Sequence, residues 1–122
     1  MQVSDFNTPP IVDHQKFEEF CEMFTMENVS ILVQKVPTSM LRRLDDIHKN
    51  IEIDDAQGVQ REFHSIKGAS AQLFGTRLSE EAARLENISH DFDAVKDALP
   101  KFEEIMRETL DWWMSHTQEI VK

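Results

Sequence analysis

The residues of this sequence best suited to chemistry lie in the segment HSIKGASAQLFG, residues 64–75. Neutral imidazole is a good nitrogen nucleophile near pH 7, because its ordinary pKa of about 6.5 leaves most of it with a free lone pair. Lys67 follows His64 by three residues, so on a helix its ammonium can reach an anion held by the imidazole. Gly68 inside a helix costs about 1 kcal/mol relative to alanine, which indicates that the missing side chain serves a purpose. The combination suits a phosphoryl group brought in by a bulky partner.

A helical projection predicts that this histidine faces solvent. With Phe63 at zero on the apolar seam, Lys67 falls at about 40° and His64 at about 100°. The small or polar residues around the imidazole are Ala71 at about 80°, Gly75 at about 120°, Gly68 at about 140° and Gln72 at about 180°. We therefore expect an exposed imidazole with bare backbone beside it.

Long helices must position these residues. The chain has only three glycines and four prolines, and from Asp13 onward its apolar residues recur with helical spacing. Pro37 predicts a kink or break in the second helix. We expect a short first helix that starts near Asp13 and a second helix over about 27–50. The third is capped by Asp54 or Asp55 and reaches about Phe74, and the fourth follows Gly75, with Thr76 as a possible cap, and ends near His90 or Asp91. The fifth covers about 93–118.

These elements predict an all-α fold, an up-and-down four-helix bundle with a short N-terminal helix covering one end. Residues 1–12 are polar with two prolines and are expected to form a flexible arm, followed by a single domain over residues 13–122. Four amphipathic stripes in one chain can cover each other, so we expect a monomer.

Composition narrows the possible partners. The 122 residues carry a formal net charge of −10, which repels a phosphate backbone and argues against nucleic acid. No apolar run is long enough to cross a bilayer, so no membrane association is expected. A lone cysteine, Cys21, cannot form an internal disulfide, and the N-terminus lacks the features of a secretory signal. The cytoplasm is the expected compartment.

The segment over residues 64–75 resembles the histidine-containing phosphotransfer (HPt) domains of bacterial and fungal phosphorelays. Their pattern is His, any residue, an aliphatic residue, Lys, Gly and two small residues, followed by a Leu-Gly pair. Here the pattern corresponds to residues 64–70, HSIKGAS, and close correspondence extends over about 63–86. The family's later glycine usually comes one position sooner than Gly75, where this chain has Phe74.

The resemblance implies a phosphocarrier without autonomous kinase activity. His64 would accept a phosphoryl group from a phosphoaspartate on the receiver domain of a hybrid sensor kinase, and would pass it to an aspartate on the receiver domain of a response regulator. Lys67 would hold the phosphoryl oxygens and Gly68 would give clearance. Partner docking would involve Ala71, Gln72 and Gly75, with exposed apolar residues of the first helix. No cofactor is expected on this chain, and the Mg²⁺ would belong to the receiver.

Two other functions fit the sequence. The first is a helical adaptor that binds and regulates a receiver domain or kinase without accepting phosphate. The second is a metal-binding bundle, because Asp45 with His48 and Glu86 with His90 have helical ligand spacing. Neither pair is the Glu-x-x-His motif of carboxylate-bridged metal sites in bundles, so we expect no metal.

Overall fold

The computed structural model describes residues 8–121, with side chains for residues 8–117. This part of the chain contains helices and no strand, which confirms the predicted all-α class. None of its helices is long and apolar enough to cross a membrane. The helices are α1 (His14–Phe24), α2 (Met26–Glu52), α3 (Ala56–Gln72), α4 (Thr76–Asn87) and α5 (Phe92–Val121).

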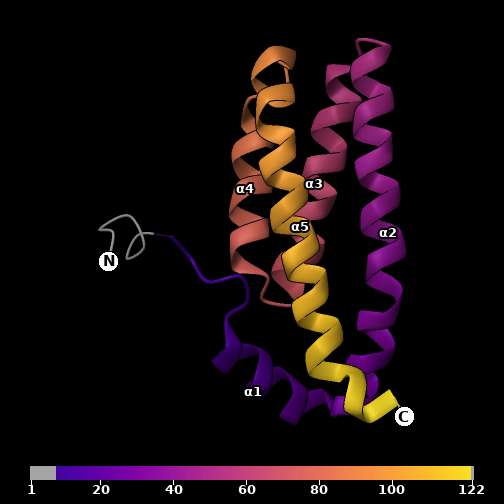
Figure 1. Ribbon diagram of the computed structural model, residues 1–122, viewed down its shortest axis with the longest axis vertical. Helices are drawn as coiled ribbons and strands as arrows, with labels where there is room; N and C mark the ends of the chain where they lie inside the picture. Colours follow the sequence, from indigo (N-terminus) through magenta and orange to yellow (C-terminus); the bar gives the residue numbers. More distant parts are fainter. Residues whose placement is uncertain (1–7, 122) are drawn as a thin grey trace.

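Helices α2 to α5 run side by side along the long axis of the molecule, and α1 lies across one end (Figure 1). Contacts join α2 to α3, α3 to α4, α4 to α5 and α5 to α2, so the four helices form a closed ring. α3 therefore has α2 and α4 as its neighbours and α5 diagonally across the core.

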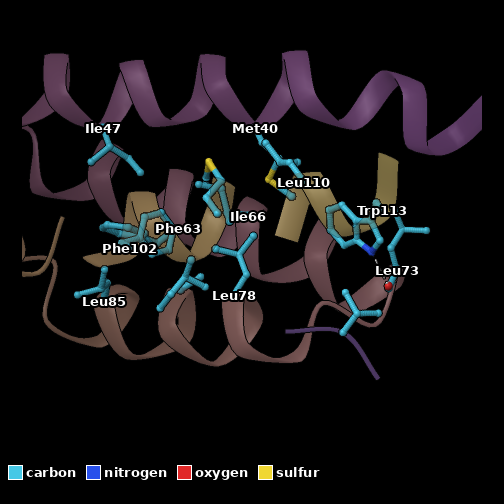
Figure 2. Close-up of a cluster of buried hydrophobic side chains, with 14 of the residues drawn as sticks. Met40, Ile47, Phe63, Ile66, Leu73, Leu78, Leu85, Phe102, Leu110 and Trp113 are labelled. Atoms are coloured by element: carbon cyan, nitrogen blue, oxygen red, sulfur yellow. Dashed lines mark hydrogen bonds between the residues drawn. The ribbon is translucent and has the colours of Figure 1, made fainter. Parts of the chain in front are cut away.

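The core lies inside this ring. Figure 2 shows Phe63 of α3 meeting Phe102 of α5, and their ring centroids lie 5.3 Å apart. The predicted inner residues of α3 and α5 are all buried: Val59, Phe63, Ile66, Ser70, Leu73, Val95, Leu99, Phe102, Met106, Thr109 and Trp113. For α2 the apolar spacing predicts an inner stripe of Val29, Leu32, Val33, Val36, Met40, Leu41, Leu44 and Ile47. This prediction is wrong at Leu41, which is 55% exposed. Leu41 follows the buried Met40 by about 100° around the helix, so only one of the two faces the core.

Two predictions about helix continuity and capping are corrected. Of the kink or break predicted at Pro37, the break does not occur, because α2 continues through this residue. Thr76 is not the cap of α4 but its first residue, with Gly75 at the cap position and the Thr76 hydroxyl donating to the Phe74 carbonyl. By contrast, Asp55 caps α3 as predicted, its carboxylate accepting from the Gly58 N–H at 2.9 Å. α4 ends at Asn87, a few residues before the predicted end.

α3 ends at Gln72 in a Schellman turn, two residues before the predicted end. The Gly75 N–H donates to the Ser70 carbonyl at 2.8 Å, and the Phe74 N–H donates to the Ala71 carbonyl at 3.1 Å. The left-handed position of this turn, usually glycine, is Phe74 with φ 61°. Its ring lies 5.7 Å from the ring of Phe20, so the side chain that strains the turn also contacts α1.

The segment before α1 is partly fixed. The Pro9 carbonyl accepts from Arg77 Nε at 2.9 Å, the Pro10 carbonyl accepts from the Arg77 N–H at 3.2 Å, and Val12 is buried. Pro9, Pro10 and Val12 of the predicted arm therefore lie against α4 and the core. Residues 1–7 of that arm lie outside the described part of the chain.

Candidate functional site

His64 lies in the middle of α3 with its side chain 67% exposed, which confirms the predicted exposure. The helix is held from within by Phe63 and Ile66, which are fully buried on the opposite side. Burial of these neighbours fixes the rotation of α3 and so directs His64 outward.

A carboxylate from α4 joins the histidine and the lysine. Glu86 Oε2 lies 3.0 Å from His64 Nδ1, and Glu86 Oε1 accepts from Lys67 Nζ at 2.7 Å. The Glu86 side chain is only 15% exposed, compared with 35% for Lys67. The site is therefore a bridge between α3 and α4, with the carboxylate at its base and the imidazole at its surface.

The environment of Glu86 favours its ionised form. The hydrogen bond from Lys67 lowers the pKa of the Glu86 carboxyl, and it outweighs the opposing effect of burial. The hydrogen bond from His64 and the positive charge of Lys67 also lower this pKa, as does the charge of His64 when its ring is protonated. Near neutral pH, Glu86 is thus an acceptor with both oxygens occupied.

The backbone of α3 is fixed to α4 next to the site. The Ser79 hydroxyl of α4 donates to the Lys67 carbonyl at 3.2 Å. The buried Ser70 hydroxyl donates to the Ile66 carbonyl at 2.6 Å and to the Lys67 carbonyl at 3.2 Å. The Ser79 bond joins the turn that carries Lys67 and Gly68 to α4, the helix that carries Glu86.

The small residues beside the imidazole divide into two groups. Gly68, Ala71 and Gln72 are exposed, and a Cβ built on Gly68 would meet no atom within 4 Å. Gly75 is buried, and a Cβ there would lie 2.9 Å from Trp113 Cζ2. The predicted surface position of Gly75 is wrong because α3 ends at Gln72, so the helical projection does not extend to residue 75.

Two hollows are relevant to docking, and the first of them borders the site. One, of about 440 Å³, is lined by His64 and its neighbours Gln60, Arg61, Ser65 and Glu86. The other, of about 270 Å³, lies between α1 and α2 and is mostly apolar; it is lined by Phe20, Phe24, Asn28, Val29, Ile31, Leu32 and Lys35. Phe20 contacts Phe74 at the end of α3, so the apolar groove connects with the end of the helix that carries His64.

Sequence reasoning missed Glu86 as a site residue and Arg61 as a residue that lines the neighbouring hollow. Glu86 was considered only for its spacing to His90, and no signal in the sequence pairs residues 64 and 86 across two helices. Arg61 precedes His64 by three residues, a spacing that could have placed it on the same face. Among the described residues, no group of three His, Cys, Asp or Glu side chains is arranged to hold a metal ion.

The geometry distinguishes the two ring nitrogens of His64. An ionised carboxylate can only accept, so the single proton of a neutral imidazole belongs on Nδ1, facing Glu86. The Nε2 lone pair then points away from the bridge, and no described residue bonds to it. Nε2 is the atom free to attack an electrophile, and the Lys67 ammonium belongs to the same bridge through the other oxygen of Glu86.

Comparison with known proteins gives one family. A family model described as the Hpt domain matches residues 31–112, about two thirds of the chain. The match begins within α2, contains all of α3 and α4 and ends within α5, so it includes the Glu86 bridge. Searches of curated proteins and of solved structures gave no significant match.

Proposed function

The chain belongs to the Hpt domain family, and on this basis we propose that it is a histidine phosphotransfer protein of a multistep phosphorelay. His64 accepts a phosphoryl group from a receiver-domain phosphoaspartate and passes it to an aspartate of another receiver domain. The observation that carries the proposal is the exposed imidazole, bonded through Nδ1 to Glu86 and open at Nε2.

The transfer needs no separate base. As the bond from Nε2 to phosphorus forms, the bond from the aspartyl oxygen to phosphorus breaks, and its electron pair stays on the aspartate carboxylate. The ring keeps its proton on Nδ1 and becomes an imidazolium, which the Glu86 carboxylate stabilises. In the second transfer, an aspartate oxygen of another receiver bonds to phosphorus while the bond from Nε2 to phosphorus breaks, and its electron pair returns to Nε2.

Lys67 and Gly68 have separate roles in this mechanism. An ammonium has three donors, so Lys67 can keep its bond to Glu86 and donate to a phosphoryl oxygen as well. Gly68 leaves open the space that an incoming receiver must occupy. The receiver supplies the Mg²⁺ that neutralises the phosphoryl charge, and this chain supplies the nucleophile and its orientation.

Docking is proposed on the surface that runs from His64 along α3 to α1. Ala71 and Gln72 continue the exposed side of α3, and the groove beside Phe24 and Ile31 offers apolar surface, since both residues are 50% exposed. An apolar surface of this kind suits a transient protein partner.

The architecture we propose is the up-and-down four-helix bundle, supported by the closed ring of helix contacts. A cytoplasmic location and the absence of kinase activity remain predictions.

The decisive experiment is phosphotransfer from phosphorylated receiver domains of the same genome to the purified protein. We expect an acid-labile, alkali-stable label that is absent in His64→Gln. The matched control is His90→Gln, which removes another exposed histidine and should leave the label unchanged. A label that persists in His64→Gln would refute the proposal, and receiver binding without any label would favour the adaptor.

A further inference from the structure

The exposed face of α3 differs in charge from the rest of the molecule. None of its exposed side chains is a carboxylate; they are Gln57, Gln60, Arg61, His64, Ala71 and Gln72, with Gly68 among them. Each of the other four helices exposes at least one Asp or Glu within its described side chains. The one acid of α3, Glu62, is 15% exposed and pairs with Arg43 of α2 at 3.2 Å.

An exposed helix face without a carboxylate is notable in a chain with 23 acidic residues and a net charge of −10. The nearest carboxylate of α4, Glu86, is already bonded to His64 and Lys67. The α3 face is therefore where a negatively charged surface meets least repulsion from this protein.

Arg61 is the fully exposed cation of this face. Its side chain is 72% exposed, and its ion-pair partner, Asp55, is 4.0 Å away and itself partly exposed. At that distance and exposure the pair holds the guanidinium weakly. Arg61 also lines the hollow beside His64, so it is available to a molecule that approaches the imidazole.

The direction of helical side chains separates Arg61 from Lys67. Side chains lean toward the N-terminus of their helix, so Lys67, one turn after His64, leans back toward the imidazole. Arg61, one turn before His64, leans away from it, as its pairing with Asp55 shows. Lys67 is thus placed to hold the phosphoryl group, and Arg61 to reach the surface of the protein that carries it.

We infer that Arg61 is a specificity-determining contact for an acidic partner surface, the rim of carboxylates around the phosphoaspartate of a receiver domain. This inference rests on the proposed phosphotransfer function. A site that binds Mg²⁺ beside a phosphoaspartate must carry further carboxylates, because this hard cation takes oxygen ligands. Arg61 pairs with that rim, and the carboxylate-free α3 face lets the rim approach.

The test compares two variants that each remove one positive charge. Arg61→Gln changes the α3 face, and Arg107→Gln changes an exposed arginine on α5, diagonally across the ring. We expect Arg61→Gln to lower the second-order rate constant for transfer from a phosphorylated receiver by about tenfold at low salt, because charge complementarity acts mainly on association. The difference should shrink at high salt, where charges are screened beyond about 3 Å at 1 M. Arg107→Gln should stay close to the parent.

A small phosphodonor, phosphoramidate, separates the possible outcomes. With this donor Arg61→Gln should label His64 as fast as the parent, since no receiver surface is present. Equal effects of Arg61→Gln and Arg107→Gln on receiver transfer would overturn the inference. Slower labelling of Arg61→Gln by phosphoramidate would also overturn it, because Arg61 would then act on the phosphoryl group. If the parent accepted phosphate from neither donor, the proposed function itself would fail.

Discussion

The Glu86 carboxylate joins two side chains of α3 with different roles in the proposed reaction: His64 supplies a lone pair and Lys67 supplies a positive charge. The imidazole must keep a lone pair on its outer nitrogen, and the ammonium must stay near it as a cation. The Glu86 carboxylate, 3.0 Å from Nδ1 and 2.7 Å from Nζ, favours the neutral tautomer that keeps the lone pair on Nε2, and it favours the charged ammonium. Because Glu86 belongs to α4, the reactivity of a residue on one helix depends on how closely the next helix packs.

Replacement of this carboxylate should change the histidine before it changes the fold. We predict that Glu86→Gln populates both neutral tautomers of His64 and slows transfer by about tenfold or more, because groups that orient a reactive imidazole typically contribute on that scale. The ¹⁵N shifts of the His64 ring measure the tautomer, and receiver-dependent labelling measures the rate. The control is Glu81→Gln, which removes a carboxylate of α4 that pairs with Arg84. An unchanged tautomer in Glu86→Gln would contradict the assigned role.

At the level of helices, Gly68 within α3 and Gly75 beyond its end are glycines for opposite reasons. Gly68 is exposed and a Cβ would meet nothing, so packing does not require glycine there. Gly75, just beyond the helix, approaches α5 so closely that a Cβ would lie 3.1 Å from Thr109 Cγ2 and nearer still to the Trp113 ring. One glycine keeps space free outside the molecule, and the other allows contact inside it.

Substitutions at these two positions should therefore separate stability from transfer. Gly68→Ala should raise the free energy of unfolding by about 1 kcal/mol, the difference in helix propensity. Gly68→Gln should keep the helix and slow transfer strongly, because its side chain fills the approach to His64. Gly75→Ala should lower stability. Urea unfolding and receiver-dependent labelling measure the two effects, and equal transfer by Gly68→Gln and the parent would refute the clearance role.

Most of the helical layout could be predicted from the sequence, because apolar spacing reports which side of a helix is buried. The seam of α3 and the exposure of His64 follow from that spacing alone, and Asp55 is recognisable as a cap. The spacing also distinguishes the two adjacent tryptophans: Trp113 is fully buried and Trp112 only partly so.

Features that depend on contacts between helices could not be predicted in this way. The helical projection failed at Gly75 because it assumes a helix that in fact ends at Gln72, and only the turn geometry reveals this. A left-handed Phe74 opposes local propensity, at a cost on the order of 1–3 kcal/mol, and is explained by its contact with Phe20 of another helix. Glu86 was missed for the same reason, since its partners lie 19 and 22 residues away.

For the molecule as a whole, the closed ring leaves few apolar side chains uncovered. The described exceptions gather partly on α1 and α2, where Met23, Phe24 and Ile31 are exposed, and Phe24 and Ile31 line the groove between the two helices. α1 is anchored beneath them by Phe17, which is buried and packs edge-on against Trp112 of α5 at 5.1 Å. The groove is thus formed by a helix that is firmly attached to the ring.

We predict that the protein is a monomer, because the ring already covers its own seams and a net charge of −10 disfavours self-association. Sedimentation equilibrium should give a mass near 14.2 kDa.

Phe24→Ser should leave that mass and the unfolding midpoint unchanged while weakening receiver binding, since Phe24 is half exposed. A dimer in the parent that Phe24→Ser dissociates would show instead that the groove joins two copies of the chain.

The open position at Gly68 has a consequence for how this protein tolerates change. A laboratory selection for heat resistance alone would replace Gly68 by residues other than proline, because these have a higher helix propensity and a Cβ at this position meets no atom within 4 Å. The larger among the enriched variants would be well folded and thermally robust, yet unable to signal. Thermal screening of this protein would therefore select variants that no longer transfer phosphate, although their folding and thermal stability would be as good as those of the parent or better.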